Sequence, residues 1–216
     1  MFLILLFVVL IIVGIYIYRF KGLDDCAVLQ TIKLDDLIIE IVDEGCKEGL
    51  PHTTGPRTVR MTRALWDGSR RDSILRHERV HCDQKGARGG EWLEFYQRAW
   101  GYKCLTAPPA GIPAEYVARR RPNPDTDAAP WAVWRGRYVF FSVFGEDRTL
   151  TGAPVHVWDL ERGRALDAPP EEWRAEFCGN GVCPHQYEHP HEISAEMITS
   201  GTSKAPAALK LFAWNR

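Results

Sequence analysis

The run His77-Glu78-Arg79-Val80-His81 restricts how this chain can fold more than any other feature of the sequence. Two histidines four residues apart lie one turn above each other on one face of a helix, so both imidazoles can reach a single metal ion. Neutral imidazole is a good zinc ligand, but a catalytic zinc needs a third protein ligand. The spacing therefore predicts a helix through this run and a further ligand brought to it by another element.

Glu78 lies next to His77, on a neighbouring face of the same predicted helix. Zinc lowers the pKa of a bound water to about 7, and a carboxylate near that water can act as its general base. The pattern therefore indicates a hydrolytic zinc site. Because two histidines and one glutamate make a short pattern, chance occurrence is the alternative.

The residues around the run favour a helix that extends beyond it on both sides. Segment 72–75 places the possible helix cap Asp72 before apolar residues, and Gly86 supplies a stop. Gln84 continues the face of the two histidines and is expected either to hydrogen-bond a ligand or to cap the last turn.

The strongest candidate for the third ligand lies near the C-terminus, in the stretch from His189 to Glu196. Pro190 suits a first helical turn, and Glu192 and Glu196 follow one turn apart. One carboxylate can bind the metal, while the other accepts the remaining N–H of a ligating imidazole and fixes its tautomer.

Together, the His-Glu-x-x-His run and the later Glu192-x-x-x-Glu196 pair resemble the site of the gluzincin metallopeptidases. The resemblance implies a Zn²⁺ cofactor, Glu192 as the third ligand, Glu196 as its support, and a peptide or protein substrate. It covers the motif helix, the helix after it and the segment near Glu192. Because His81 and Glu192 are farther apart than in gluzincins, it also implies an inserted subdomain around residues 105–185.

Glu91 and Glu94 compete with Glu192 for the role of third ligand. Apolar residues recur at helical spacing around them and predict a buried stripe, which turns both glutamates toward solvent. The residues of this stripe are Trp92, Phe95, Tyr96, Ala99 and Trp100.

A second set of possible zinc ligands combines Cys178 and Cys183 with His185 and His189. The favoured interpretation is a small disulfide loop closed by the two cysteines, with the histidines exposed.

Peptide hydrolysis also needs a donor for the oxyanion of the tetrahedral intermediate. The nearest candidates are Tyr187, His185 and His191, which lie just before or beside Glu192, although each of them can equally be a surface residue.

The N-terminus carries an uncharged apolar run from Phe2 to Tyr18, closed by Arg19 and Lys21. Its length is close to the ~17 to 25 residues of a spanning helix, so residues 1–20 are expected to form a single-pass transmembrane anchor. A cleaved signal peptide is the alternative, but no basic segment precedes the run and no small-residue cleavage site follows it.

The side of the membrane that holds the domain stays open. The basic residues after the run favour a cytoplasmic domain, whereas six cysteines are compatible with three disulfides in an oxidising compartment, or equally with buried thiols. The cysteines are Cys26, Cys46, Cys82, Cys104, Cys178 and Cys183.

Residues 21–50 are expected to form a linker or strand region, followed by a zincin-like domain over residues 51–216. Residues 58–62 alternate like a half-buried strand. The resemblance implies that this strand lies at the sheet edge beside the substrate cleft, where a peptide can add as a further strand. Residues 131–166 are rich in aromatic and β-branched residues and predict a small antiparallel sheet within the insertion.

The composition fits one sizeable core, with 45% hydrophobic residues and 8 tryptophans. The expected fold class is α+β: a zincin-like domain with the motif helix, a second packed helix, the inserted sheet and an N-terminal transmembrane helix. A formal net charge of −1 gives little support for a nucleic-acid partner.

These features predict a membrane-anchored zinc metallopeptidase in which His77, His81 and Glu192 bind the metal and Glu78 activates water. The alternative is a catalytically inactive or metal-free, membrane-tethered interaction domain that disulfides stabilise. Intact Glu78 argues for the enzyme, because metal ligation alone does not require this residue.

Overall fold

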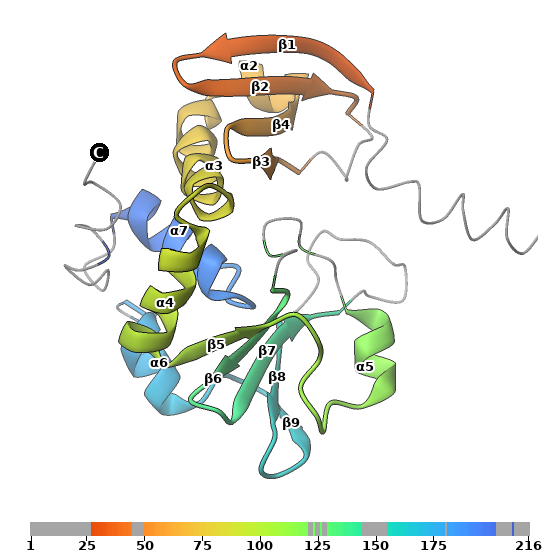
Figure 1. Ribbon diagram of the computed structural model, residues 1–216, viewed down its shortest axis with the longest axis vertical. Coiled ribbons are helices and arrows are strands. Elements are labelled where there is room, and N and C mark those ends of the chain that lie inside the picture. Colours follow the sequence, from red (N-terminus) through yellow and green to blue (C-terminus); the bar gives the residue numbers. More distant parts are fainter. Residues whose placement is uncertain are drawn as a thin grey trace, which may run out of the picture.

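The computed structural model describes residues 27–44, 50–120, 123, 126, 129–143, 155–179, 181–201 and 209. They form two lobes, each built on its own β-sheet, which helices α3 and α7 join (Figure 1). The first lobe contains β1 (Val28–Leu34), β2 (Leu37–Val42), β3 (His52–Gly55), β4 (Thr58–Thr62), α2 (Arg63–Asp67) and α3 (Arg71–Lys85). The second contains α4 (Gly89–Trp100), β5 (Tyr102–Leu105), α5 (Ala114–Arg119), β6 (Trp131–Trp134), β7 (Tyr138–Ser142), β8 (Val155–Asp159), β9 (Arg164–Leu166) and α6 (Glu171–Phe177), and α7 (Pro190–Ser200) follows.

The first sheet has the strand order β1-β2-β4-β3, with β2 and β4 parallel and the other pairs antiparallel. In β2 the side chains of Leu37, Ile39 and Ile41 are buried, while Ile38 between them is 41% exposed, as alternation along a strand requires. The buried set packs against Leu75 of α3, so this helix covers one face of the sheet.

The position of β4 corrects an expectation from the sequence. Residues 58–62 do form a strand, but it pairs with β2 on one side and β3 on the other, so it is an interior strand. The edge strand of this sheet beside the motif helix is β3. Residues 28–42, which belong to the region expected to link the membrane to the domain, form two further strands of the same sheet.

The second sheet is an antiparallel meander in the order β5-β6-β7-β8-β9. The expected strands within residues 131–166 are confirmed, and β5 adds to one side. One face of the sheet packs on α4 through a stripe of aromatic rings, and α5 lies on the other face. Within the predicted stripe of α4, Trp92, Tyr96 and Trp100 are buried, whereas Ala99 is exposed.

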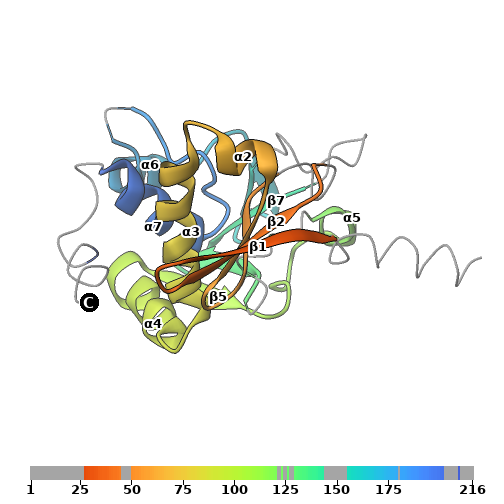
Figure 2. The same ribbon diagram turned by 90° about the horizontal axis from the view of Figure 1, so that it is seen from above.

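Helices α3 and α7 lie side by side in both ribbon views (Figures 1 and 2). Gly86 ends α3, as expected, but Asp72 lies in its first turn, where a carboxylate is favourable beside the helix dipole, rather than at the cap. In α7, Pro190 occupies the first turn, and the side chain of His189 caps the helix by accepting the backbone N–H of His191.

The fold class expected from the sequence includes a transmembrane helix, and the described residues do not contain one: none of their six helices is long and apolar enough to cross a membrane. These residues form two sheets, in the orders β1-β2-β4-β3 and β5-β6-β7-β8-β9. The secondary structure itself is α+β. The anchor expected over residues 1–20 lies outside the part of the chain that the structure describes.

Candidate metal centre

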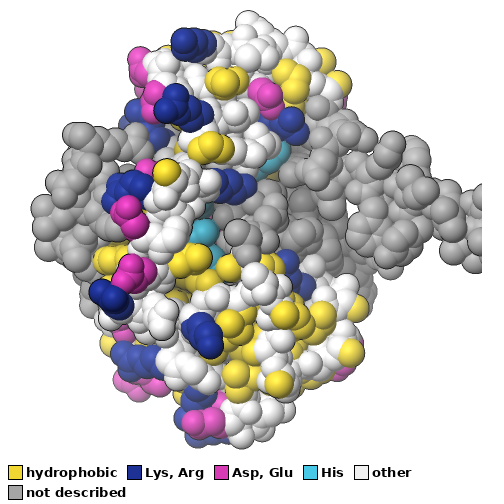
Figure 3. All heavy atoms as spheres, viewed as in Figure 1, with side chains coloured by type: hydrophobic (Ala, Val, Ile, Leu, Met, Phe, Trp, Pro, Cys, Tyr) yellow, Lys and Arg dark blue, Asp and Glu magenta, His cyan; other side chains and the backbone are white. Residues whose placement is uncertain are grey.

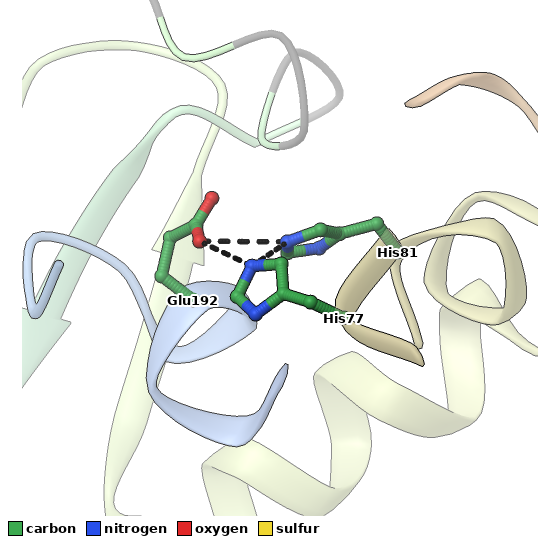
Figure 4. A group of neighbouring side chains, drawn as sticks. All are labelled: His77, His81 and Glu192. Atoms are coloured by element: carbon green, nitrogen blue, oxygen red, sulfur yellow. Dashed lines mark hydrogen bonds and ion pairs between the residues drawn. The ribbon is translucent and has the colours of Figure 1, made fainter. Parts of the chain in front are cut away.

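Three side chains from α3 and α7 converge between the two lobes (Figure 4). Nε2 of His77 lies 3.0 Å from Nε2 of His81 and 3.3 Å from Oε2 of Glu192. The third side of the triangle, from His81 Nε2 to Glu192 Oε2, is 3.4 Å. These residues form a group whose ligand atoms are close enough together to hold one metal ion.

The triangle has the size that a tetrahedral zinc requires. Ligand atoms about 2.1 Å from a tetrahedral ion lie about 3.4 Å from one another. The observed separations of 3.0 to 3.4 Å are therefore compatible with three ligands at one face of a tetrahedron. Such a face leaves the fourth position for a water or a substrate oxygen.

Gln84 fixes the orientation of His81. The carboxamide nitrogen of Gln84 faces three acceptors, the hydroxyls of Tyr96 and Ser194 and the carbonyl of His191, at 3.0, 2.9 and 3.2 Å. The carboxamide oxygen must then be the atom that lies 2.7 Å from His81 Nδ1. Because that oxygen can only accept, Nδ1 carries the proton, and Nε2 has the lone pair that can bind a metal.

Glu192 is fixed from the opposite side by Asn123, whose Nδ2 donates to Oε1 at 2.9 Å and to Oε1 of Glu188 at 3.2 Å. This bond leaves Oε2 of Glu192 directed at the two histidines. Burial alone raises the pKa of Glu192, but its interactions with the imidazoles of His81 and His77 outweigh burial and hold the pKa well below its usual range. A buried anion between two imidazoles favours a bound cation.

Glu78 is 3% exposed and is bound to the edge strand of the first sheet. The hydroxyl of Thr53 in β3 lies 2.9 Å from Oε2 of Glu78 and 3.2 Å from the backbone carbonyl oxygen of Glu78, and it can donate to either. The carbonyl of Thr53 in turn accepts Nζ of Lys85 at 2.5 Å. Strand β3 is therefore attached to α3 at the residue next to the first histidine.

A cavity of about 440 Å³ opens beside the metal centre, between the first half of α3 and the second half of α7. His77 and Glu192 form part of its wall, so one side of the candidate site is accessible. The space-filling view shows histidine side chains in the hollow between the two lobes (Figure 3). The remaining lining residues are Arg70, Ser73, Ile74, His185, Gln186, Glu196, Thr199 and Ser200.

The other residues singled out in the sequence lie in different surroundings. The Glu196 carboxylate accepts the backbone N–H of His185 at 2.6 Å instead of a histidine ring, and both residues line the cavity. The ring of Tyr187 packs on Trp173 in the core of the second lobe. His191 is buried, with its ring 5.4 Å from that of Tyr96.

Glu91 and Glu94 are exposed on α4, as the periodicity predicts. They pair with Arg88 and Arg98, at 3.1 and 2.6 Å respectively, and neither belongs to the metal-binding group.

The cysteines favour the disulfide interpretation of the region near residue 180. Cys178 and Cys183 form a disulfide with an S–S distance of 2.08 Å, so they are not metal ligands. Cys82 and Cys104 are free thiols, which excludes both from a set of three disulfides. Cys26 and Cys46 lie outside the described residues.

Several supporting residues carry no signal in the sequence. Thr53 is one of several threonines ahead of the motif, and Asn123 stands in a proline-rich stretch far from both metal-binding segments. Ser194 also carries no such signal, because residues two positions apart, here Glu192 and Ser194, do not share a face of the predicted helix. Its hydroxyl bonds Gln84 and Tyr96 and so ties α7 to α3 and α4.

The chain was compared with known proteins at the levels of family, sequence and structure. No protein-family model matches it, and neither the curated proteins nor the solved structures gave a match. The site geometry therefore carries the functional argument.

Proposed function

We propose that this protein is a zinc-dependent metallopeptidase. The observation that carries the proposal is the triangle formed by His77, His81 and Glu192, with sides of 3.0 to 3.4 Å. Glu78 directly follows His77 and is not one of the three residues of the metal-binding group. Three ligands with one open position and an adjacent carboxylate are the parts that a hydrolytic zinc site needs.

In this proposal Glu78 is the general base. A zinc ion held by the three ligands would polarise the substrate carbonyl and lower the pKa of the attacking water. The Glu78 carboxylate takes a proton from that water as the oxygen attacks the peptide carbonyl. Glu78 then passes the proton to the leaving nitrogen as the C–N bond breaks, so the base is regenerated at the end of the cycle.

Strand β3 supports a peptide substrate over other classes. It is the edge strand of its sheet, since β4 occupies only one of its sides, and Thr53 at its centre contacts Glu78. An extended peptide placed along β3, on the side away from β4, would gain backbone hydrogen bonds. Its carbonyls would then pass close to the proposed base, which suits an endopeptidase that recognises backbone.

The metal content of the full-length protein tests the first half of the proposal. After dialysis, elemental analysis should find about one zinc per chain, and His77→Ala and Glu192→Ala should each abolish this binding, because two remaining ligands do not hold a catalytic zinc. Glu94→Gln on the exposed face of α4 is the control and should retain zinc. A parent protein that binds no zinc when zinc is supplied contradicts the proposal.

Cleavage of a mixed peptide library, read by mass spectrometry, tests the second half. Glu78→Gln should retain zinc and the contact with Thr53 but lose at least about 100-fold in cleavage rate, because an amide cannot take the proton. Zinc-loaded protein that cleaves no peptide, or a Glu78→Gln variant with full activity, contradicts the proposed chemistry.

A further inference from the structure

The cavity beside the metal centre is unusually polar for a ligand site. Pockets that bind small molecules are mostly lined by apolar side chains, yet Ile74 is the only apolar residue among those described in this wall. At about 440 Å³ the cavity has room for a long side chain. Its wall therefore favours a polar or charged group.

Glu196 is the acidic group in this wall that is not part of the metal centre. Its side chain is half-buried, and Oε2 accepts the backbone N–H of His185 at 2.6 Å. No lysine, arginine or histidine among the described residues forms an ion pair with it. The carboxylate is thus held in place by a neutral backbone donor, and no cationic side chain of the described residues occupies it.

The wall also contains a cation, Arg70, which lies farther from the metal. Arg70 precedes His77 by seven residues, or about 10 Å along the helix, and its side chain is exposed at the start of α3. Glu196 follows Glu192 by one turn, or about 6 Å. A side chain that enters the cavity from a substrate at the metal therefore meets Glu196 first.

We propose that Glu196 makes this cavity a subsite for a basic side chain, lysine or arginine, of the substrate residue next to the scissile bond. This inference rests on the proposed peptidase function and names the substrate class of that site. A lysine side chain spans about 6 Å, which matches the rise between Glu192 and Glu196. The role differs from that expected from the sequence, in which Glu196 supports a metal ligand.

Binding of paired hydroxamate probes to the zinc-loaded, full-length protein tests the subsite. Two short peptide hydroxamates differ only in one side chain, lysine or its uncharged isostere norleucine, at the residue next to the metal-binding group. Calorimetry should give about tenfold tighter binding of the lysine probe, since a half-buried charge pair supports a preference of this size. Peptides with the same two residues next to the cleaved bond should show the same preference in kcat/KM.

The variant Glu196→Gln retains an acceptor for the N–H of His185 and removes only the charge. It should bind the norleucine probe like the parent protein and lose the preference for lysine. Glu91→Gln, an exposed residue on α4, is the matched control and should retain the preference.

The outcomes separate the two proposals. Probes that bind equally well to the parent protein, or a lysine preference that persists in Glu196→Gln, overturn the subsite and leave the peptidase intact. If the zinc-loaded protein binds neither probe and cleaves no peptide, the proposed function fails and the subsite fails with it.

Discussion

The hydroxyl of Thr53 lies 2.9 Å from Oε2 of Glu78, so an edge strand holds the carboxylate that we propose as the general base. Both residues are buried, at 0% and 3% exposure, and they lie 25 positions apart in the chain. The contact makes the position of the base depend on the strand that a peptide substrate would extend. In the proposed reaction, one side chain would therefore align a substrate docked on β3 with the group that activates water.

Replacing Thr53 by valine should lower kcat about tenfold with little change in KM or zinc content. Valine has the same shape but cannot donate to Glu78, so the carboxylate loses its fixed position while the metal ligands keep theirs. We also expect a loss of about 1–3 kcal/mol in the free energy of unfolding, because a buried charged acceptor loses its donor. Steady-state kinetics and chemical denaturation measure the two effects.

The conservative variant separates positioning from stability. Thr53→Ser restores the hydroxyl without the methyl group, and its kcat should return close to that of the parent. If both variants lose kcat equally, the hydroxyl does not position the base.

Gln84 should control zinc affinity without touching the metal. Its carboxamide oxygen accepts Nδ1–H of His81 at 2.7 Å and sets the tautomer in which Nε2 has the lone pair. Gln84→Ala should weaken zinc binding roughly 10- to 100-fold. Competition with a chelating dye gives the dissociation constant, and Gln97→Ala, at an exposed position of α4, is the control. Unchanged affinity in Gln84→Ala would show that the packing of α3 alone orients His81.

Asp159 should make stability depend on acid pH. Two hydrogen bonds from Arg137, at 3.0 and 2.6 Å, hold the pKa of this carboxyl below its usual range, even though burial opposes ionisation. A carboxyl whose pKa is lower in the folded than in the unfolded protein stabilises the fold at every pH above its unfolded-state pKa of about 3.9. This stabilisation is lost as the pH falls through the pKa of the folded state. Asp159→Asn should therefore destabilise the protein at pH 7.

Urea denaturation at pH 7, 5 and 3 tests this sign. The difference between parent and Asp159→Asn should be constant from pH 7 to 5 and should shrink at pH 3. The exposed Asp72→Asn variant serves as the control for a general charge effect. A difference that grows toward low pH would contradict the assigned direction.

The sequence predicts the parts of the site that a helical repeat places together. His77, His81 and Gln84 share a face because of the period of α3, and the one-turn spacing after Pro190 places Glu192 and Glu196 on one side of α7. That Glu192 faces the two histidines was inferred by resemblance, and the geometry agrees with it. The same spacing does not decide whether Glu196 faces a histidine or a cavity, since this depends on the angle between two helices.

The remaining parts depend on how distant segments pair. Strand β4 lies inside its sheet because β2, about 20 residues earlier, pairs with it in parallel, and alternation within β4 is the same at an edge or in the interior. Thr53 reaches the site through the position of β3, and Asn123 reaches it from the segment between α5 and β6. No pattern in the sequence links Thr53 to the Glu78 carboxylate, 25 positions away, or Asn123 to the Glu192 carboxylate, 69 positions away.

Zinc should stabilise the whole protein, because its ligands come from both α3 and α7 and these helices join the lobes. A ligand that binds only the folded state at 100 times its dissociation constant adds about 2.7 kcal/mol, which for a chain of this size raises Tm by roughly 5–10 °C. Thermal unfolding of the full-length protein with zinc and with EDTA measures the shift. Glu192→Ala removes the ligand that α7 supplies, so its Tm should be the same in both conditions. A parent protein whose Tm does not respond to zinc, at concentrations that saturate the site, would show that the two helices pack without help from the metal.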